Sequence, residues 1–119
     1  MPGTHYADVV PFVTLDGSTV RELLHPRLHG NHRQSVAEAI VPPGASTRLH
    51  WHQQSEEIYH ITAGEGVMTL GEERFAVRRG DTICIAPGTR HCIENIGRDE
   101  LRLLCCCAPA YAHEDTHLV

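Results

Sequence analysis

Apolar residues along this chain occur in short runs that alternate with polar residues and stop at turn-forming sequences. Two runs lie within residues 6–24, and the Asp16-Gly17 dipeptide between them is typical of tight hairpin turns. A third run, residues 35–41, stops at Pro42-Pro43-Gly44, because two prolines remove two backbone donors and the glycine permits a sharp reversal. These patterns predict two strands before residue 25 and a third over residues 35–41.

The remainder of the chain repeats this pattern without a helical period. A polar stretch with proline, glycine and asparagine, residues 25–35, favours a loop. Beyond residue 44, one strand is predicted over 46–52, and short apolar runs between turns predict strands over 57–63, 67–70, 74–77, 82–86, 91–95 and 101–109. The polar segment after Pro109 is expected to be mobile or packed on the outside. The sequence therefore predicts an all-β protein.

About ten short antiparallel strands in so small a chain must close into a barrel or pair as two sheets, because open sheet edges invite aggregation. A length of 119 residues fits one domain with its own core. We therefore predict a single domain over residues 1–119 that forms a jelly-roll barrel. Its core is expected at about residues 18–109, between N-terminal strands and a polar C-terminal tail.

Composition narrows the range of partners. Hydrophobic residues make up 41% of the chain and charged residues 21%, as in globular proteins, and no apolar run approaches the ~20 residues that span a bilayer. The net charge is −5, from 10 Lys+Arg against 15 Asp+Glu, and no basic cluster is dense enough to hold a phosphate backbone. We therefore expect no membrane and no nucleic-acid partner, and instead a small-molecule ligand or substrate in the mouth of the barrel.

Cysteine usage and the N-terminal sequence both favour the cytoplasm. The five cysteines are an odd number, which argues against a secreted disulfide framework. Three of them, Cys105 to Cys107, are consecutive and cannot chelate as a unit, because neighbours on a strand face opposite ways. The first residues lack the basic start and apolar segment of a signal peptide. We expect free, buried, unreactive thiols in a cytoplasmic protein.

Residues 50–57 contain the densest group of candidate metal ligands. Strand residues two apart share a face, so His50 and His52 present both imidazoles to one side. A short connection follows, and the next strand can return antiparallel as a hairpin that brings Glu57 beside His52. His91, at the start of a later strand, is the candidate for a fourth ligand. These four side chains facing one interior predict a divalent transition-metal site.

The spacing of these residues resembles the two motifs of the cupin superfamily. The first motif is matched, in order, by Gly44, His50, His52, Glu57 and Gly64. The second is matched by Gly80, Pro87, Gly88, His91 and Asn95. One departure is Ala86, which stands where the family prefers proline. The resemblance covers residues 44–95 and implies a small single-domain cupin, a double-stranded β-helix barrel with one metal ion inside.

The identity of the ion stays open, because imidazole and carboxylate ligands suit iron, manganese, cobalt, nickel, copper and zinc alike. Four protein ligands on an octahedral ion leave two positions for water, substrate or dioxygen, unlike a closed tetrahedral zinc site.

Strand parity extends the candidate site to Arg48 and Tyr59, which should face inward with the ligands. Arg48 would hold a carboxylate or enolate through paired hydrogen bonds. The alternative is that Arg48 lies at the rim and pairs with Glu38 or solvent. Tyr59 would donate a proton to a ligand oxygen, or would be a core tyrosine with a satisfied hydroxyl.

Three functions are compatible with these observations. The cupin resemblance favours a metal-dependent oxidoreductase of the dioxygenase type that acts on a small anionic or oxygen-rich organic molecule. A sugar or sugar-phosphate isomerase or lyase is an alternative, although no phosphate cradle is evident near the motifs. A non-catalytic metabolite-binding cupin is a third. The resemblance also implies a homodimer that pairs through the N-terminal strands.

Overall fold

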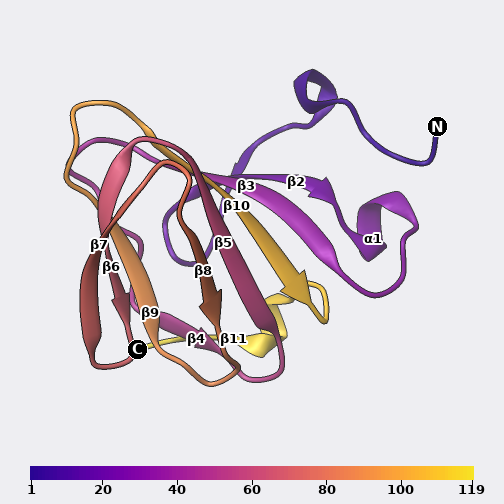
Figure 1. Ribbon diagram of the computed structural model, residues 1–119. Helices are drawn as coiled ribbons and strands as arrows, with labels where there is room; N and C mark the ends of the chain where they lie inside the picture. Colours follow the sequence, from indigo (N-terminus) through magenta and orange to yellow (C-terminus); the bar gives the residue numbers. More distant parts are fainter.

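Two antiparallel sheets face each other and enclose the core (Figure 1). The computed structural model describes residues 1–119. One sheet has six strands in the order β1-β2-β3-β10-β5-β8, and the other has five in the order β11-β4-β9-β6-β7. The predicted all-β jelly-roll class is confirmed. No helix is long and apolar enough to cross a membrane.

The strands over residues 35–41 and 56–108 follow the predicted ranges to within two residues, whereas the strand predicted over 46–52 is confined to residues 50–52 and the strand over residues 116–118 was not predicted. The six-stranded sheet consists of β1 (Phe12–Val13), β2 (Thr19–Leu24), β3 (Ser35–Val41), β10 (Leu101–Ala108), β5 (Glu56–Ala63) and β8 (Thr82–Ile85). The five-stranded sheet consists of β11 (Thr116–Leu118), β4 (His50–His52), β9 (His91–Asn95), β6 (Glu65–Leu70) and β7 (Glu73–Arg78). Short helical turns occur at η1 (Tyr6–Asp8), α1 (Pro26–His29) and η2 (His113–Asp115).

Two segments differ from the sequence prediction. The loop expected over residues 25–35 contains α1, which begins at a proline and is capped by the His25 side chain, whose Nδ1 accepts a hydrogen bond from the Arg27 backbone. The tail expected to be mobile or peripheral instead forms β11, which pairs with β4 so that Thr116 stands opposite His52. The C-terminal residues therefore belong to the sheet that carries three of the candidate ligands.

The core lies between the sheets because each strand alternates inward apolar and outward polar side chains. The largest fully buried apolar side chains are Val41, Ile61, Ile85, Leu101 and Leu103 from the six-stranded sheet and Met68 and Ile93 from the five-stranded sheet. Each such burial contributes ~1.5–3 kcal/mol of transfer free energy, so these residues stabilise the contact between the two sheets.

Close approach of strands constrains β6. A Cβ atom added at Gly66 would lie 2.5 Å from the Glu94 carbonyl oxygen on β9, so only glycine lets the two strands pair at this register. β9 in turn carries His91 at its first position. The packing of these strands thus fixes one wall of the interior site.

The N-terminal residues form an arm on the side of β2 and α1 (Figure 1), where the Thr4 hydroxyl donates to the Leu23 carbonyl and the Tyr6 hydroxyl to Glu38. Val10 and Val13 on this segment are 80% and 69% exposed. β1 lies at the edge of the six-stranded sheet. The arm therefore presents apolar side chains to solvent.

Candidate metal centre

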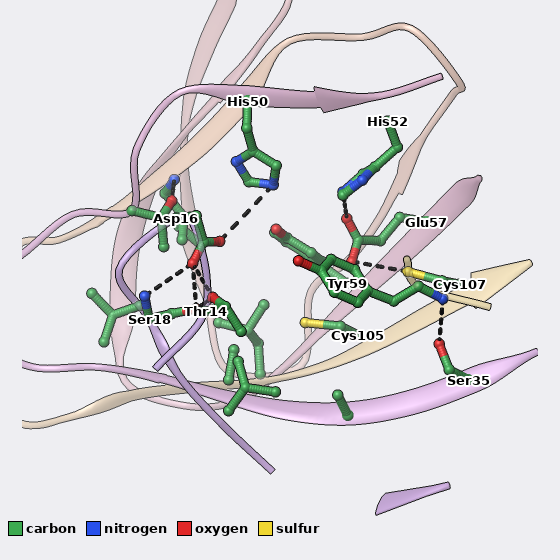
Figure 2. Close-up of a pocket in the computed structure, with 18 of the residues that line it drawn as sticks. Thr14, Asp16, Ser18, Ser35, His50, His52, Glu57, Tyr59, Cys105 and Cys107 are labelled. Carbon is green, nitrogen blue, oxygen red and sulfur yellow. Dashed lines mark hydrogen bonds and ion pairs between the residues drawn. The ribbon is translucent and has the colours of Figure 1, made fainter. Parts of the chain in front are cut away.

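Four buried side chains meet inside the barrel at one end of its cavity. His50, His52, Glu57 and His91 each offer one ligand atom, and these atoms all lie within 4.8 Å of one another. Figure 2 shows two of the imidazoles and the carboxylate converging from opposite sides of the cavity. The four residues that the sequence singled out are therefore brought together.

The two histidines of β4 and the one of β9 come from neighbouring strands. His50 and His52 are both buried while Trp51 between them is partly exposed, which confirms the expected strand parity. His50 stands opposite His91 in the β4–β9 register, and the two ring centroids are 4.2 Å apart. Three imidazoles thus project from one sheet into the same space.

Glu57 reaches the imidazoles by a different route from the one expected. The predicted hairpin is wrong, because β4 and β5 belong to different sheets and do not pair with each other. The connection between them crosses the barrel, and Glu57 projects back from the six-stranded sheet. Its Oε1 lies 3.2 Å from the His52 Nε2 and 3.3 Å from the His91 Nε2.

Hydrogen bonds at the outer ring nitrogens orient the imidazoles. The Nδ1–H groups of His50 and His91 donate to the backbone carbonyls of Arg48 and Thr89, at 2.8 and 2.9 Å. A carbonyl oxygen only accepts, so the proton lies on Nδ1 and the Nε2 lone pair faces the centre.

The third imidazole is oriented by a side chain. The Thr116 hydroxyl gives its hydrogen to the Ala112 carbonyl at 2.8 Å and lies 3.0 Å from the Nδ1 of His52. With its hydrogen engaged, this hydroxyl accepts from Nδ1–H. His52 therefore also turns an Nε2 lone pair inward, which is the arrangement that metal-ligating histidines require.

The buried atoms at the centre fit a cation. The His91 Nε2 and the Glu57 Oε1 are buried and have no hydrogen-bond partner within the chain. Buried polar atoms without partners are costly, and here lone pairs face one another at 3.2–3.3 Å. A divalent ion bound by these atoms would satisfy them all, so the donor set present is suited to such an ion.

The charge states at the centre also suit metal ligation. Burial raises the pKa of the Glu57 carboxyl, but the adjacent imidazoles of His52 and His91 outweigh burial and lower that pKa to about 2. The pKa of His50 is lowered, mainly by burial and further by the nearby His91. The centre therefore presents an ionised carboxylate and, at His50, favours the neutral imidazole, which are the forms that bind metals.

Glu57 is supported from behind by a thiol. The Cys107 Sγ donates to the Glu57 Oε2 at 3.2 Å, which leaves Oε1 directed at the imidazoles. Burial, reinforced by the Glu57 charge, raises the pKa of the Cys107 thiol, so the group keeps its proton and remains a donor. The sequence predicted only a buried, unreactive thiol here, because a cysteine in an apolar strand gives no sign of its partner.

A small cavity adjoins the ligand atoms. Its volume is about 50 Å³. Its apolar lining includes Val20, Ala39, Val41, Ile93 and Leu103, and its polar lining includes Asp16, Glu22, Tyr59 and Tyr111. No lysine or arginine lines it. The space suits a molecule of only a few heavy atoms, since one water needs roughly 10–15 Å³ on this scale.

Comparison with known proteins agrees with this geometry. The family model described as "Cupin domain" matches residues 37–107, which include all four candidate ligands. This chain is a cupin. A relative that covers nearly its whole length is the uncharacterized protein MJ1618 of Methanocaldococcus jannaschii, 54% identical over 98% of this chain and 93% of that protein.

Other relatives connect this cupin to proteins that are named for a function. The oxalate-binding protein of Thermotoga maritima is 35% identical over 69% of this chain and 68% of that protein. A solved structure from the same organism, described as a predicted oxalate decarboxylase, superposes with a TM-score of 0.76 at 29% identity, over 88% of this chain and 96% of that chain. The polyketide cyclase RemF of Streptomyces resistomycificus, with a TM-score of 0.84 over 100% of this chain and 85% of that chain, is 22% identical and supports the fold alone.

The inward orientation expected for Arg48 is wrong. Arg48 is exposed and does not line the cavity of this cupin, whereas Thr47 is buried. Regular alternation fails here because β4 begins only at His50, and Thr47 turns inward so that its hydroxyl accepts from the Ile93 backbone. Of the rim alternative, the pairing with Glu38 is not observed, since Glu38 pairs with Arg21 and Arg102, whereas the exposure of Arg48 to solvent agrees with it.

Tyr59 does face inward, as parity predicts. It is 4% exposed, lines the cavity and lies beside Glu57 in the interior (Figure 2). Burial raises the pKa of its hydroxyl well above the usual value, and the Glu57 charge adds to this. The phenol therefore keeps its proton next to the ligand cluster.

Proposed function

We propose that this cupin is a metal-dependent enzyme that binds one divalent transition metal ion through His50, His52, Glu57 and His91. Its substrate would be a small, oxygen-rich organic molecule. The observation that carries the proposal is the set of three inward Nε2 lone pairs and one carboxylate oxygen at the end of a small cavity. The mixed nitrogen and oxygen donor set matches catalytic metal sites that keep open positions.

When bound there, a divalent ion would act as a Lewis acid toward a substrate oxygen and, if redox-active, would support chemistry of the oxygenase type. The chain's own residues have distinct tasks around it. The apolar lining excludes water from the ligand. The Tyr59 hydroxyl, which keeps its proton, would donate a hydrogen bond to a ligand oxygen and orient it.

The relatives support the substrate class. A curated relative is named for oxalate binding, and another, 31% identical over 74% of this chain and 57% of that protein, is the polyketide synthase CurC of Streptomyces cyaneus. Both names concern oxygen-rich molecules. The isomerase or lyase alternative receives less support for phosphorylated sugars, because no lysine or arginine lines the cavity to hold a phosphate.

A non-catalytic ligand-binding role is the second candidate, and the oxalate-binding relative is the observation that favours it. The two functions are separated by one experiment. Protein made without an affinity tag in metal-supplemented medium would be analysed for bound metals, and oxygen consumption would then be followed with a panel of small hydroxy and keto compounds. Stoichiometric metal with substrate-dependent oxygen uptake supports the oxygenase. Metal with ligand binding and no turnover of any panel member supports the binding protein.

We also propose a cytoplasmic homodimer that pairs through the N-terminal strands. Exposed apolar side chains at Val10, Phe12, Val13 and Leu15 and the edge position of β1 support this pairing. Light scattering at micromolar concentration should give twice the chain mass. A mass equal to that of one chain would contradict the proposed homodimer.

A further inference from the structure

The cavity wall that faces the ligand cluster carries a carboxylate with one fixed oxygen and one free oxygen. Asp16 lies in the turn between β1 and β2. Its Oδ1 accepts hydrogen bonds from the Thr14 hydroxyl at 2.6 Å, the Ser18 hydroxyl at 2.6 Å and the Ser18 backbone N–H at 2.9 Å. Three donors on one oxygen hold the carboxylate in a single orientation.

The other oxygen of Asp16 points into the cavity. Oδ2 lies 3.9 Å from the His50 Nε2 and receives no hydrogen bond from the chain (Figure 2). The side chain is 15% exposed, so the group is largely removed from solvent. A partly desolvated carboxylate oxygen next to a metal centre is a strong acceptor for a ligand's O–H group.

A second unpartnered acid lines the same cavity. Glu22 on β2 is 7% exposed, and its Oε2 is buried without a hydrogen-bond partner. Glu22 and Asp16 are not offset by any lysine or arginine in the lining. A hydroxyl on a ligand can both donate and accept, so it matches the Glu22 carboxyl in either protonation state. A ligand carboxylate opposite Asp16 would meet a like charge.

From this arrangement we infer that Asp16, with Glu22, determines specificity by accepting hydrogen bonds from hydroxyl groups of a ligand held at the metal centre. The ligand class is then an uncharged small hydroxy-carbonyl or polyhydroxy compound, and not a dicarboxylate. The inference rests on the proposed function, because it requires the ion to hold the other end of the ligand. It separates this chain from its relative named for oxalate.

Charge balance supports the same class. A divalent ion with the Glu57 and Asp16 carboxylates sums to zero, and an ionised Glu22 would add one negative charge, so an uncharged ligand adds no further charge to the buried site. A dicarboxylate would bring two further negative charges into a cavity of about 50 Å³ that has no side-chain cation. Buried net charge of this kind is strongly disfavoured unless it is paired.

The test compares two ligands of nearly equal size in the cobalt-loaded protein. Hydroxyacetone and pyruvate share a methyl ketone, and one carries a hydroxymethyl group where the other carries a carboxylate. Dissociation constants for both would be measured from the visible absorption of bound Co²⁺, in the wild-type chain and in Asp16→Asn. Asparagine keeps an amide oxygen for the three donors of the turn, while its Nδ2 replaces the free carboxylate oxygen.

We expect Asp16→Asn to weaken the binding of hydroxyacetone and strengthen that of pyruvate. The ratio of the two dissociation constants should move about tenfold or more in favour of pyruvate, equivalent to ~1.4 kcal/mol. Glu72→Gln, which removes the same charge from an exposed turn, should leave the ratio within about twofold. A ratio equally unchanged in Asp16→Asn would overturn the inference, as would loss of cobalt from that variant, which would make Asp16 a ligand. Wild-type protein that binds no cobalt would overturn the proposed metal function itself, a distinguishable result.

Discussion

The two sheets contribute to the metal centre in different ways. The five-stranded sheet supplies three imidazoles, and two of these are oriented by backbone carbonyls that no side-chain substitution removes. The six-stranded sheet supplies one carboxylate, Glu57, which is oriented by a thiol from the neighbouring strand β10. Two of the three nitrogen ligands are therefore oriented by the backbone of the fold, while the oxygen ligand depends on one replaceable side chain.

The largest effect should come from removing a nitrogen ligand. His91→Ala deletes an imidazole whose Nε2 has no partner within the chain, so the metal affinity should fall by more than the 10–100-fold typical of outer contacts. Metal content measured after dialysis would drop from one ion per chain to a small fraction. Circular dichroism should still report a folded β protein, because the apolar core does not depend on the ion.

The matched control for this substitution is an exposed histidine. His32 is exposed and lies far from the cluster in sequence, so His32→Ala should keep one ion per chain. A folded His91→Ala protein that retains full metal would show that the assignment of His91 is incorrect.

A smaller effect is expected on the carboxylate side. Cys107→Ala removes the donor to the Glu57 Oε2, which frees the carboxylate to rotate. We expect metal affinity to fall ~10-fold, in the range known for supporting contacts. Cys107→Ser restores an O–H donor and should recover most of that loss. The metal affinities of the wild-type protein and of the two variants would be measured by competition with a chelator.

Cys105 provides the comparison within the same strand. Its side chain also lines the cavity but makes no hydrogen bond to a ligand. Cys105→Ala should therefore change metal affinity less than Cys107→Ala. Equal losses in the two variants would mean that Cys107 acts through packing and not through its thiol donor.

His52 is the one imidazole of the five-stranded sheet that is oriented by a side chain, Thr116. Its orientation should therefore be sensitive to substitution, as that of Glu57 is. Thr116→Val keeps the shape but removes the acceptor for the Nδ1–H of His52. We expect a several-fold to ~10-fold loss of metal affinity. Thr116→Ser, which keeps the hydroxyl, should behave as wild type. If valine and serine give the same affinity, the hydroxyl does not orient His52.

Sequence reasoning found the parts of the site that depend on local spacing. His50 and His52 share a face because strand alternation is a local property, and His91 stands at the predicted strand start. The sequence did not predict the orientation of side chains that depends on tertiary contacts. Arg48 turned outward because alternation does not extend into the irregular segment before β4.

The other features that the sequence did not predict correctly have one cause. Glu57 was assigned to the correct cluster through a hairpin that does not exist, since no local rule reveals that consecutive strands enter opposite sheets. Thr116 and Cys107 contact ligands 64 and 50 residues away in the chain. Pairings of this range arise from the closing of the barrel, so a polar tail and a cysteine-rich strand carry no sequence sign of them.

The smallest expected effect on the metal concerns the outer face of the six-stranded sheet. All five cysteines are free, but the expectation that all are buried is wrong, because Cys84 is exposed on the edge strand β8. Ile83 and Ile85 face the core, so the residue between them must face outward. A thiol reagent should therefore modify Cys84 first, while buried Cys107, whose pKa is raised, reacts slowly.

Metal content should stay unchanged after one equivalent of modification, and mass spectrometry of the digested protein would locate the adduct. Early modification of Cys107, with release of metal, would show instead that the interior of the six-stranded sheet is open to solvent, and the contrast between its two faces would not hold.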